Sequence, residues 1–217
     1  MNEAREEVLA RVRAGVGKGD FAARRALAEA ALAAPVRGPQ PQFTGDLVER
    51  FCEKAATLAS TVERVSSEAD VPQAVARYLL AHGIPAQAVV TADIGELPWR
   101  DAGIDVAVRA AFDADLVGIS GCFCAVAETG PLLLCSGPET PATVSLLPET
   151  HIAMVRVSRI VGTMEDAFAR LRAETGDWPR ALNFISGPSR TGDIEQTIVL
   201  GAHGPCRVHL ILVEDNQ

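Results

Sequence analysis

The chain has 217 residues, of which 48% are hydrophobic, so it is long enough to form one sizeable hydrophobic core. Its net charge of −8, with basic residues scattered among acidic ones, excludes the positive surface that nucleic-acid binding needs. The longest purely apolar runs are far too short to cross a bilayer, and the charged N-terminus has no apolar signal core. We therefore expect a soluble, cytoplasmic protein without a membrane span or a nucleic-acid partner.

The N-terminal part of the chain predicts two helices and a linker. Residues 1–34 mix Ala, Leu, Arg and Glu in a helical pattern that Gly15–Gly19 interrupts, and Asp20 stands where it can cap the second helix. The segment 35–42 (PVRGPQPQ) holds three prolines and one glycine, which prevents regular structure. We predict an N-terminal helical arm and linker over residues 1–42, and one α/β domain over residues 43–217.

Helix and strand patterns alternate in the next part of the chain. Apolar residues spaced by three and four predict a helix over Phe43–Leu58, and a second helix is predicted over Val71–His82. Short apolar runs predict strands at 61–65, 86–92 and 104–110. This alternation is typical of the α/β class, with a largely parallel central sheet flanked by helices.

From Asp115 onward, apolar runs follow one another with Gly and Pro between them. The runs DLVGISGCFCAVAE, PLLLCS, ATVSLL and HIAMVRV predict consecutive short strands with no room for helices, the uniformly apolar ones in the centre of the sheet. One further helix, over Met164–Glu174, precedes the strand-like runs NFIS and CRVHLILVE.

Five cysteines raise the question of metal or redox chemistry. The close pair Cys122 and Cys124 has C-x-C spacing without a second pair, which is not the pattern of a zinc or iron–sulfur site. The odd number argues against a disulfide framework, and the four histidines are too dispersed to indicate a metal cluster. We expect no metal site and no cofactor, with the cysteines serving as small buried hydrophobic residues.

Three stretches rich in glycine and polar residues are the candidate binding segments: 127–130 (AETG), 186–195 (SGPSRTGDIE) and 201–205 (GAHGP). Each follows or ends a strand-like run, and open α/β sheets bind ligands at strand ends. The second stretch can gather backbone N–H groups and hydroxyls around Arg190, whose guanidinium suits a carboxylate or phosphate. The alternative is a turn in which Arg190 pairs with a neighbouring acid, and composition favours neither.

Glu128 is the candidate catalytic residue. A carboxylate directly after the apolar run 125–127 is costly unless it is hydrogen-bonded, paired or used in chemistry. We expect it to face the same cleft as Arg190 and His203; the alternative is a structural turn whose backbone amides hold the carboxylate. The predicted substrate- or anion-binding residues are Thr129, Gly130, Ser186, Gly187, Ser189, Arg190, Thr191, Asp193 and His203.

Several blocks over residues 115–214 carry a family resemblance. AETGPLLL, SLLPETHIAMV with IVGTMEDAF, and ISGPSRTGDIE with LGAHGP resemble, in order, the motifs of the LUD-domain family, in its lactate-utilisation protein C (LutC/YkgG) group. The resemblance implies a NagB/RpiA/CoA-transferase-like fold. It also implies a role beside iron–sulfur partner proteins in the oxidation of L-lactate to pyruvate.

The sequence departs from this family pattern in two places. Cys122 and Phe123 stand where the family commonly has Ala-Asp, which removes a carboxylate that could partner Glu128. An arginine common before Ser-Leu-Leu-Pro is also missing, with Pro141–Val144 in its region. Both changes alter the charged groups that an ordinary site of the family would contain.

The resemblance favours a component of an L-lactate utilisation system: an anion-binding subunit without metal that works with iron–sulfur proteins and a small carboxylate or phosphate ligand. Whether the chain is itself an enzyme stays open. The turn Glu128-Thr-Gly130 is similar to the Glu-x-Gly turn of CoA transferases, whose glutamate attacks an acyl thioester, so a transferase-like or isomerase-like enzyme is one alternative. A metabolite-sensing regulatory module is the other.

Overall fold

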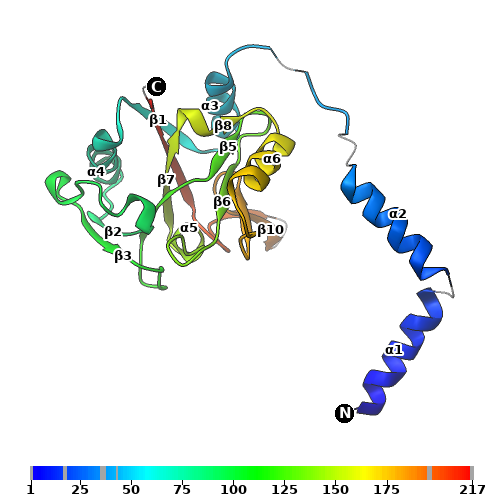
Figure 1. The fold of residues 1–217 in the computed structure, drawn as a ribbon. Coiled ribbons are helices and arrows are strands. Elements are labelled where there is room, and N and C mark those ends of the chain that lie inside the picture. The colour runs from blue at the N-terminus through cyan, green and yellow to red at the C-terminus, as the bar shows by residue number, and fades with distance from the viewer. Residues whose placement is uncertain (1, 17–18, 35–37, 43, 195–196, 216–217) are drawn as a thin grey trace. The chain divides into compact units, whose positions relative to one another are not determined.

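The structure is a computed structural model that describes residues 2–16, 19–34, 38–42, 44–194 and 197–215, without the side chains of 2, 193, 194, 197 and 198. It divides into two compact units, Met1–Phe43 and Thr44–Gln217. The first unit contains the helices α1 (Asn2–Val16) and α2 (Phe21–Ala33) (Figure 1). Asp20 caps α2 as predicted, because its Oδ1 accepts hydrogen bonds from two backbone N–H groups at the start of the helix.

The second unit is built on a six-stranded sheet in which every neighbouring pair of strands is parallel. In spatial order the strands are β1 (Thr61–Val65), β12 (Arg207–Val213), β7 (Thr150–Arg156), β4 (Val117–Gly121), β2 (Gln87–Val90) and β3 (Asp105–Val108) (Figure 1). The predicted α/β class with a largely parallel central sheet is therefore confirmed.

A second, four-stranded sheet contains β8 (Ile160–Val161), β5 (Cys124–Val126), β6 (Leu132–Cys135) and β9 (Leu182–Ile185). The apolar run PLLLCS belongs to this sheet, so the prediction that it lies in the centre of the main sheet is wrong. The pattern misleads because this sheet is also covered on both faces. β10 (Arg190–Ile194) and β11 (Thr197–Leu200) form a separate antiparallel hairpin.

The predicted helices agree within one residue with α4 (Val71–Ala81) and α6 (Met164–Glu174), whereas α3 (Leu47–Thr57) begins four residues later than predicted, after its cap Asp46. Local signals explain their ends. Thr163 and Asp166 form a reciprocal capping box at the start of α6. After α4, Gly83 takes a left-handed φ of 64°, which favours glycine. Short 3₁₀ helices complete the chain: η1 (Glu68–Asp70), η2 (Ala92–Ile94), η3 (Arg100–Ala102) and η4 (Val157–Arg159).

The run 142–147 (ATVSLL), predicted as a strand, forms the short helix α5 (Thr143–Leu146) instead. Val144 and Ser145 are both buried, whereas the two leucines that follow them are exposed, a distribution that the alternating faces of a strand do not produce. Gly118 on β4 makes room for this helix, because a Cβ at that position would overlap the carbonyl oxygen of Val144. The backbone of α5 therefore lies directly on β4.

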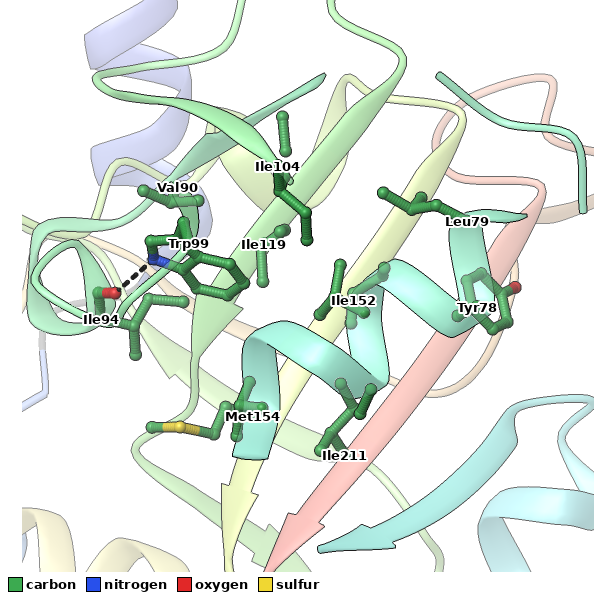
Figure 2. Close-up of a cluster of buried hydrophobic side chains, with 14 of the residues drawn as sticks. Tyr78, Leu79, Val90, Ile94, Trp99, Ile104, Ile119, Ile152, Met154 and Ile211 are labelled. Atoms are coloured by element: carbon green, nitrogen blue, oxygen red, sulfur yellow. Dashed lines mark hydrogen bonds between the residues drawn. The ribbon is translucent and has the colours of Figure 1, made fainter. Parts of the chain in front are cut away.

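Two apolar layers hold the central sheet in place. On one face, Ile152 and Met154 of β7 pack with α4 and with Trp99, whose indole Nε1 donates a hydrogen bond of 3.0 Å to the carbonyl oxygen of Ile94 (Figure 2). On the other face, the alternate residues of β7 pack with Phe51 of α3 and with the second sheet. α6 covers the far side of the second sheet. None of the described helices combines the length and apolarity that crossing a lipid bilayer requires.

Candidate binding crevice

A cavity of about 240 Å³ opens where β2, β4 and β7 end. The strand order changes direction here: from β2 the sheet continues outward to β3, whereas from β4 it continues to β7 on the other side. Loops that leave neighbouring strands in opposite directions part at such a point, and open α/β sheets bind ligands in the resulting crevice. We call this cavity the C-terminal crevice.

The crevice is lined by both sheets and by the segment before α5. Its lining residues come from the end of β2 (Thr91, Asp93), the end of β4 (Ser120, Gly121, Cys122, Phe123), the second sheet (Leu134, Cys135, Ser136, Asn183), the α5 region (Thr140, Pro141, Ala142, Ser145) and the end of β7 (Arg156, Arg159). Hydroxyl, amide and guanidinium groups are frequent among them. The lining is therefore rich in polar groups, although the hydroxyls of Thr140 and Ser145 already donate to the carbonyl oxygens of Cys135 and Ala142.

Two arginines supply positive charge to the crevice. Arg156 Nε donates a hydrogen bond of 2.5 Å to Glu68, and this bond raises the pKa of the guanidinium. Arg159 Nη1 donates a bond of 2.5 Å to Glu174, and its guanidinium lies 5.5 Å from the ring centroid of Phe123. Each guanidinium has five N–H donors, so these contacts orient both arginines and leave donors for a ligand.

A carboxylate and an amide line the crevice together with the arginines. A Cβ at Gly121 would overlap the carboxylate of Asp93, so the missing side chain lets this acid approach the end of β4. The amide nitrogen Nδ2 of Asn183 is buried and has no hydrogen-bond partner among the residues that the structure describes. An unpaired buried donor costs about 1–3 kcal/mol, which an acceptor on a ligand would recover.

The thiols near the crevice are poor nucleophiles. Burial raises the pKa of Cys122 and of Cys135, which line it, and raises that of Cys124 to about 12. The reactive form of cysteine is the thiolate, so these side chains stay protonated and weakly reactive near neutral pH. Across the described ranges, no three His, Cys, Asp or Glu side chains come together in an arrangement that could hold a metal ion.

A buried serine–histidine pair reaches the floor of the crevice. Ser120 Oγ lies 2.9 Å from Nε2 of His151 on the neighbouring strand β7. Burial lowers the pKa of His151 to about 4, so its ring is neutral at physiological pH. The pair therefore combines a hydroxyl that faces the crevice with an uncharged imidazole beneath it.

The turn with Glu128 lies between β5 and β6, against α3. The backbone N–H of Glu128 donates a hydrogen bond of 3.0 Å to the carbonyl oxygen of Gly162. Gly130, with φ of 86°, packs against the backbone of α3. The side chain of Glu128 is half-buried, and Thr129 is exposed. Glu128 is not among the described residues that line the C-terminal crevice.

The structure brings the other two candidate segments together, at the opposite end of the sheet. Ser189 exchanges backbone hydrogen bonds with the segment 201–205, accepting one from Gly201 and donating one to Pro205. Gly187 lies against Leu58, whose carbonyl oxygen accepts a bond of 3.3 Å from Arg190 Nη2. Leu58 precedes β1, so these contacts lie near the amino ends of the parallel strands.

His203 lines a separate hollow with Glu149 and Cys206, which precede β7 and β12. Of Glu128, Arg190 and His203, only His203 lines one of the three described cavities. The expectation that they share one cleft stays a prediction.

The remaining candidates occupy different surroundings. Ser186 is exposed, Thr191 is buried in β10, and Asp193 lies in β10 with its side chain outside the described part. The anion-binding roles assigned to these residues stay predictions. Sequence reasoning missed the polar residues of the crevice, although Asp93 follows one predicted strand and Arg156 ends another, so the rule on carboxyl ends could have found both.

Comparison with known proteins identifies the family. Residues 100–213, more than half of the chain, match the sequence model of the LUD domain. The chain belongs to the LUD-domain family. The resemblance seen in the sequence blocks is thereby confirmed, and both departures from the family pattern, at Cys122-Phe123 and in Pro141–Val144, contribute residues to the lining of the crevice.

Relatives of this LUD-domain protein include three named lactate utilization protein C. The one from Deinococcus radiodurans is 31% identical over 186 residues, which are 82% of this chain and 85% of the relative. The one from Exiguobacterium sp. is 36% identical over 179 residues, 78% and 72% of the two chains. The one from Bacillus licheniformis is 37% identical over 120 residues, so the match spans 54% of this chain and about half, 50%, of that relative.

A solved structure shares the fold of this LUD-domain protein. It is a DUF162 family protein from Deinococcus radiodurans, with a TM-score of 0.57 and 25% sequence identity. The alignment covers 80% of this chain and 99% of the solved one.

Proposed function

We propose that this protein is a component of an L-lactate utilisation system that binds a small organic carboxylate in the C-terminal crevice. The choice of a carboxylate ligand rests on the hydrogen-bond donors around the crevice: Arg156, Arg159 and the unpaired Nδ2 of Asn183. The names of the relatives, lactate utilization protein C, support the pathway. L-lactate carries a carboxylate that suits a guanidinium fork and a hydroxyl that suits neighbouring polar groups.

The arginines favour binding of moderate strength. Each is already bonded to a glutamate, Arg156 to Glu68 and Arg159 to Glu174, so part of its charge is offset. Both side chains keep partial solvent access, 38% and 30%, which allows a ligand to reach them. Hydrogen bonds to charged groups contribute about 1.5–3 kcal/mol each, enough to select a carboxylate over a neutral analogue.

Oxidising a 2-hydroxy acid to a 2-oxo acid removes two electrons, which must pass to a redox group. We assign the redox step to iron–sulfur partner proteins, which the family resemblance implies, and the binding of the carboxylate to this subunit. Co-purification from cells grown on L-lactate tests the partner: an iron–sulfur protein retained at a fixed ratio supports it, and recovery of this chain alone argues against it.

Calorimetric titration with L-lactate tests the ligand. Arg159→Lys keeps the charge and loses the planar fork, so we expect the Kd for L-lactate to rise about tenfold. Arg190→Lys is the matched control at the other end of the sheet and should leave the Kd within about twofold. If Arg190→Lys weakens binding and Arg159→Lys does not, the ligand lies at the 186–205 segments and the crevice assignment is wrong.

The transferase-like alternative gains no specific support from the described structure. Its candidate nucleophile, Glu128, lies in a turn against α3 and not in the lining of the crevice. Incubation with acyl-coenzyme A and a free carboxylate tests it directly, because thioester exchange that Glu128→Gln abolishes would establish the transferase.

A further inference from the structure

The buried pair of Ser120 and His151 has the composition of a catalytic dyad, and its surroundings decide whether it acts as one. Ser120 and His151 are 2% and 0% exposed, and only Ser120 is among the described residues that line the crevice. In the parallel pairing of β4 with β7, Gly118 lies opposite His151, and Ser120 is two residues further along on the same side of the strand. The imidazole of His151 therefore lies nearer the amino ends of the strands than the hydroxyl of Ser120, and farther from the crevice.

Two arrangements of protons could give the distance of 2.9 Å between Ser120 Oγ and His151 Nε2. In a nucleophilic dyad the hydroxyl donates to an unprotonated Nε2, and the ring proton lies on Nδ1. In the other arrangement the proton lies on Nε2 and is donated to Oγ. In the first tautomer Nδ1 is a donor that needs a hydrogen-bond acceptor, and in the second it is an acceptor.

The surroundings of Nδ1 favour the second arrangement. This atom is buried and has no hydrogen-bond partner among the described residues. A proton on Nδ1 would therefore be a buried donor without an acceptor, and orphaned buried N–H groups are rarer than unpaired acceptors. Placing the proton on Nε2 leaves a lone pair on Nδ1 and turns His151 into a donor to Ser120.

The basicity of His151 points the same way. A general base must accept the serine proton as the bond forms, which would leave an imidazolium in the core. Burial lowers the pKa of His151 to about 4, and no carboxylate in the described structure is hydrogen-bonded to its ring. A dyad that lacks the third, charged group is poorly suited to activating a nucleophile.

We infer that Ser120 is a fixed hydrogen-bond donor to the bound carboxylate, oriented by the Nε2–H of His151, and that it is not a nucleophile. Because its oxygen accepts from His151, the hydroxyl proton of Ser120 is directed away from that bond and toward the crevice. His151 is a positioning residue that does not touch the ligand. This inference rests on the proposed function, since it names a further donor of the same site.

Calorimetric titration with L-lactate tests the donor with a matched pair of variants. Ser120→Ala should raise the Kd about tenfold, as expected for a lost hydrogen bond to a charged group. Ser145→Ala removes the same atom from the same crevice, but the hydroxyl of Ser145 already donates to the carbonyl oxygen of Ala142 at 3.0 Å, so the Kd should change less than about twofold. Equal affinities of wild type and Ser120→Ala would overturn the inference.

Variants of His151 separate positioning from mere packing. His151→Gln keeps an N–H donor for Ser120 and should hold the Kd within about threefold, whereas His151→Leu removes the donor and should approach the value of Ser120→Ala. A rescue by His151→Gln is a result that a purely structural role would not give. If His151→Gln and His151→Leu weaken binding equally while both remain folded, the positioning role is refuted.

NMR of the imidazole nitrogens in the wild-type protein identifies the tautomer directly, whatever the ligand and whether or not a variant folds. We expect the proton on Nε2 of His151, and a proton on Nδ1 would overturn the inference. Treatment with a serine-reactive fluorophosphonate should likewise leave Ser120 unmodified, and a covalent adduct that disappears in His151→Gln would establish a nucleophile. If wild type binds no L-lactate while the tautomer is as expected, the proposed ligand fails and the orientation of Ser120 stands.

Discussion

Acidification should destabilise this protein well above the pH range in which carboxyl groups titrate. Two buried histidines are responsible. Burial is the main cause that lowers the pKa of both His151 and His209 to about 4. For His209, Glu63 opposes this effect, with its carboxylate 3.8 Å from Nε2.

The direction and size of the effect follow from proton linkage. As the pH falls below about 6.5, each imidazole takes up a proton in the unfolded chain but stays neutral in the folded one, so stability present at neutral pH is lost down to the folded pKa of about 4. At about pH 5 each imidazole is about 1.5 pH units below its pKa in the unfolded chain. Each of these units lowers the free energy of unfolding by about 1.4 kcal/mol. Each histidine therefore costs about 2 kcal/mol, and the two together about 4 kcal/mol.

Urea unfolding at a series of pH values measures this loss. We expect the free energy of unfolding to fall by about 4 kcal/mol between about pH 8 and about pH 5, a large part of the 5–15 kcal/mol typical of a domain. In His151→Gln the fall should be about half as large, whatever the absolute stability of that variant. A fall of less than about 1 kcal/mol in the wild type would refute the claim that these imidazoles are held neutral by burial.

Four substitutions, one of them a control, test packing and the turn. Phe51→Ala empties a fully buried site between α3 and the sheet and should lower the free energy of unfolding by about 3–5 kcal/mol; a loss below about 1 kcal/mol would contradict this packing. Gly118→Ala places a Cβ against the carbonyl oxygen of Val144 and should cost about 3 kcal/mol or more in urea unfolding, whereas Gly176→Ala, which meets no atom within 4 Å, should cost less than about 1 kcal/mol. Glu128→Gln should leave stability within about 0.5 kcal/mol, and the catalytic hypothesis predicts that it abolishes growth on L-lactate of a strain lacking the gene, which full growth would refute.

Local signals made much of the fold predictable. The strand at 61–65 and the helix over Met164–Glu174 agree with the structure at both ends, because alternation and capping act within a few residues. The second sheet was not predictable, since an apolar run does not reveal which of two covered sheets it joins. α5 was missed because its place depends on a distant glycine, Gly118, that admits its backbone.

The candidate site was harder to predict than the fold for a related reason. Glycine-rich turns drew attention to the 186–205 segments, but such turns occur at both ends of a parallel sheet and do not say which end they occupy. The polar residues of the crevice stand singly in the sequence, Asp93 after one strand and Asn183 inside another. They come together through strand order, which no spacing in the sequence encodes.

The chain crosses from the central sheet to the second sheet at the floor of the crevice, since β4 ends at Gly121 and β5 begins at Cys124. A ligand bound there would touch both sheets at their junction and act as a clamp across it. Binding would then stabilise the closed arrangement of the two sheets against opening. This stabilisation grows with the ratio of ligand concentration to Kd. Amide hydrogen exchange in the second sheet should therefore slow when the crevice is occupied, so the protection of strands β5 and β6 would report occupancy of the crevice.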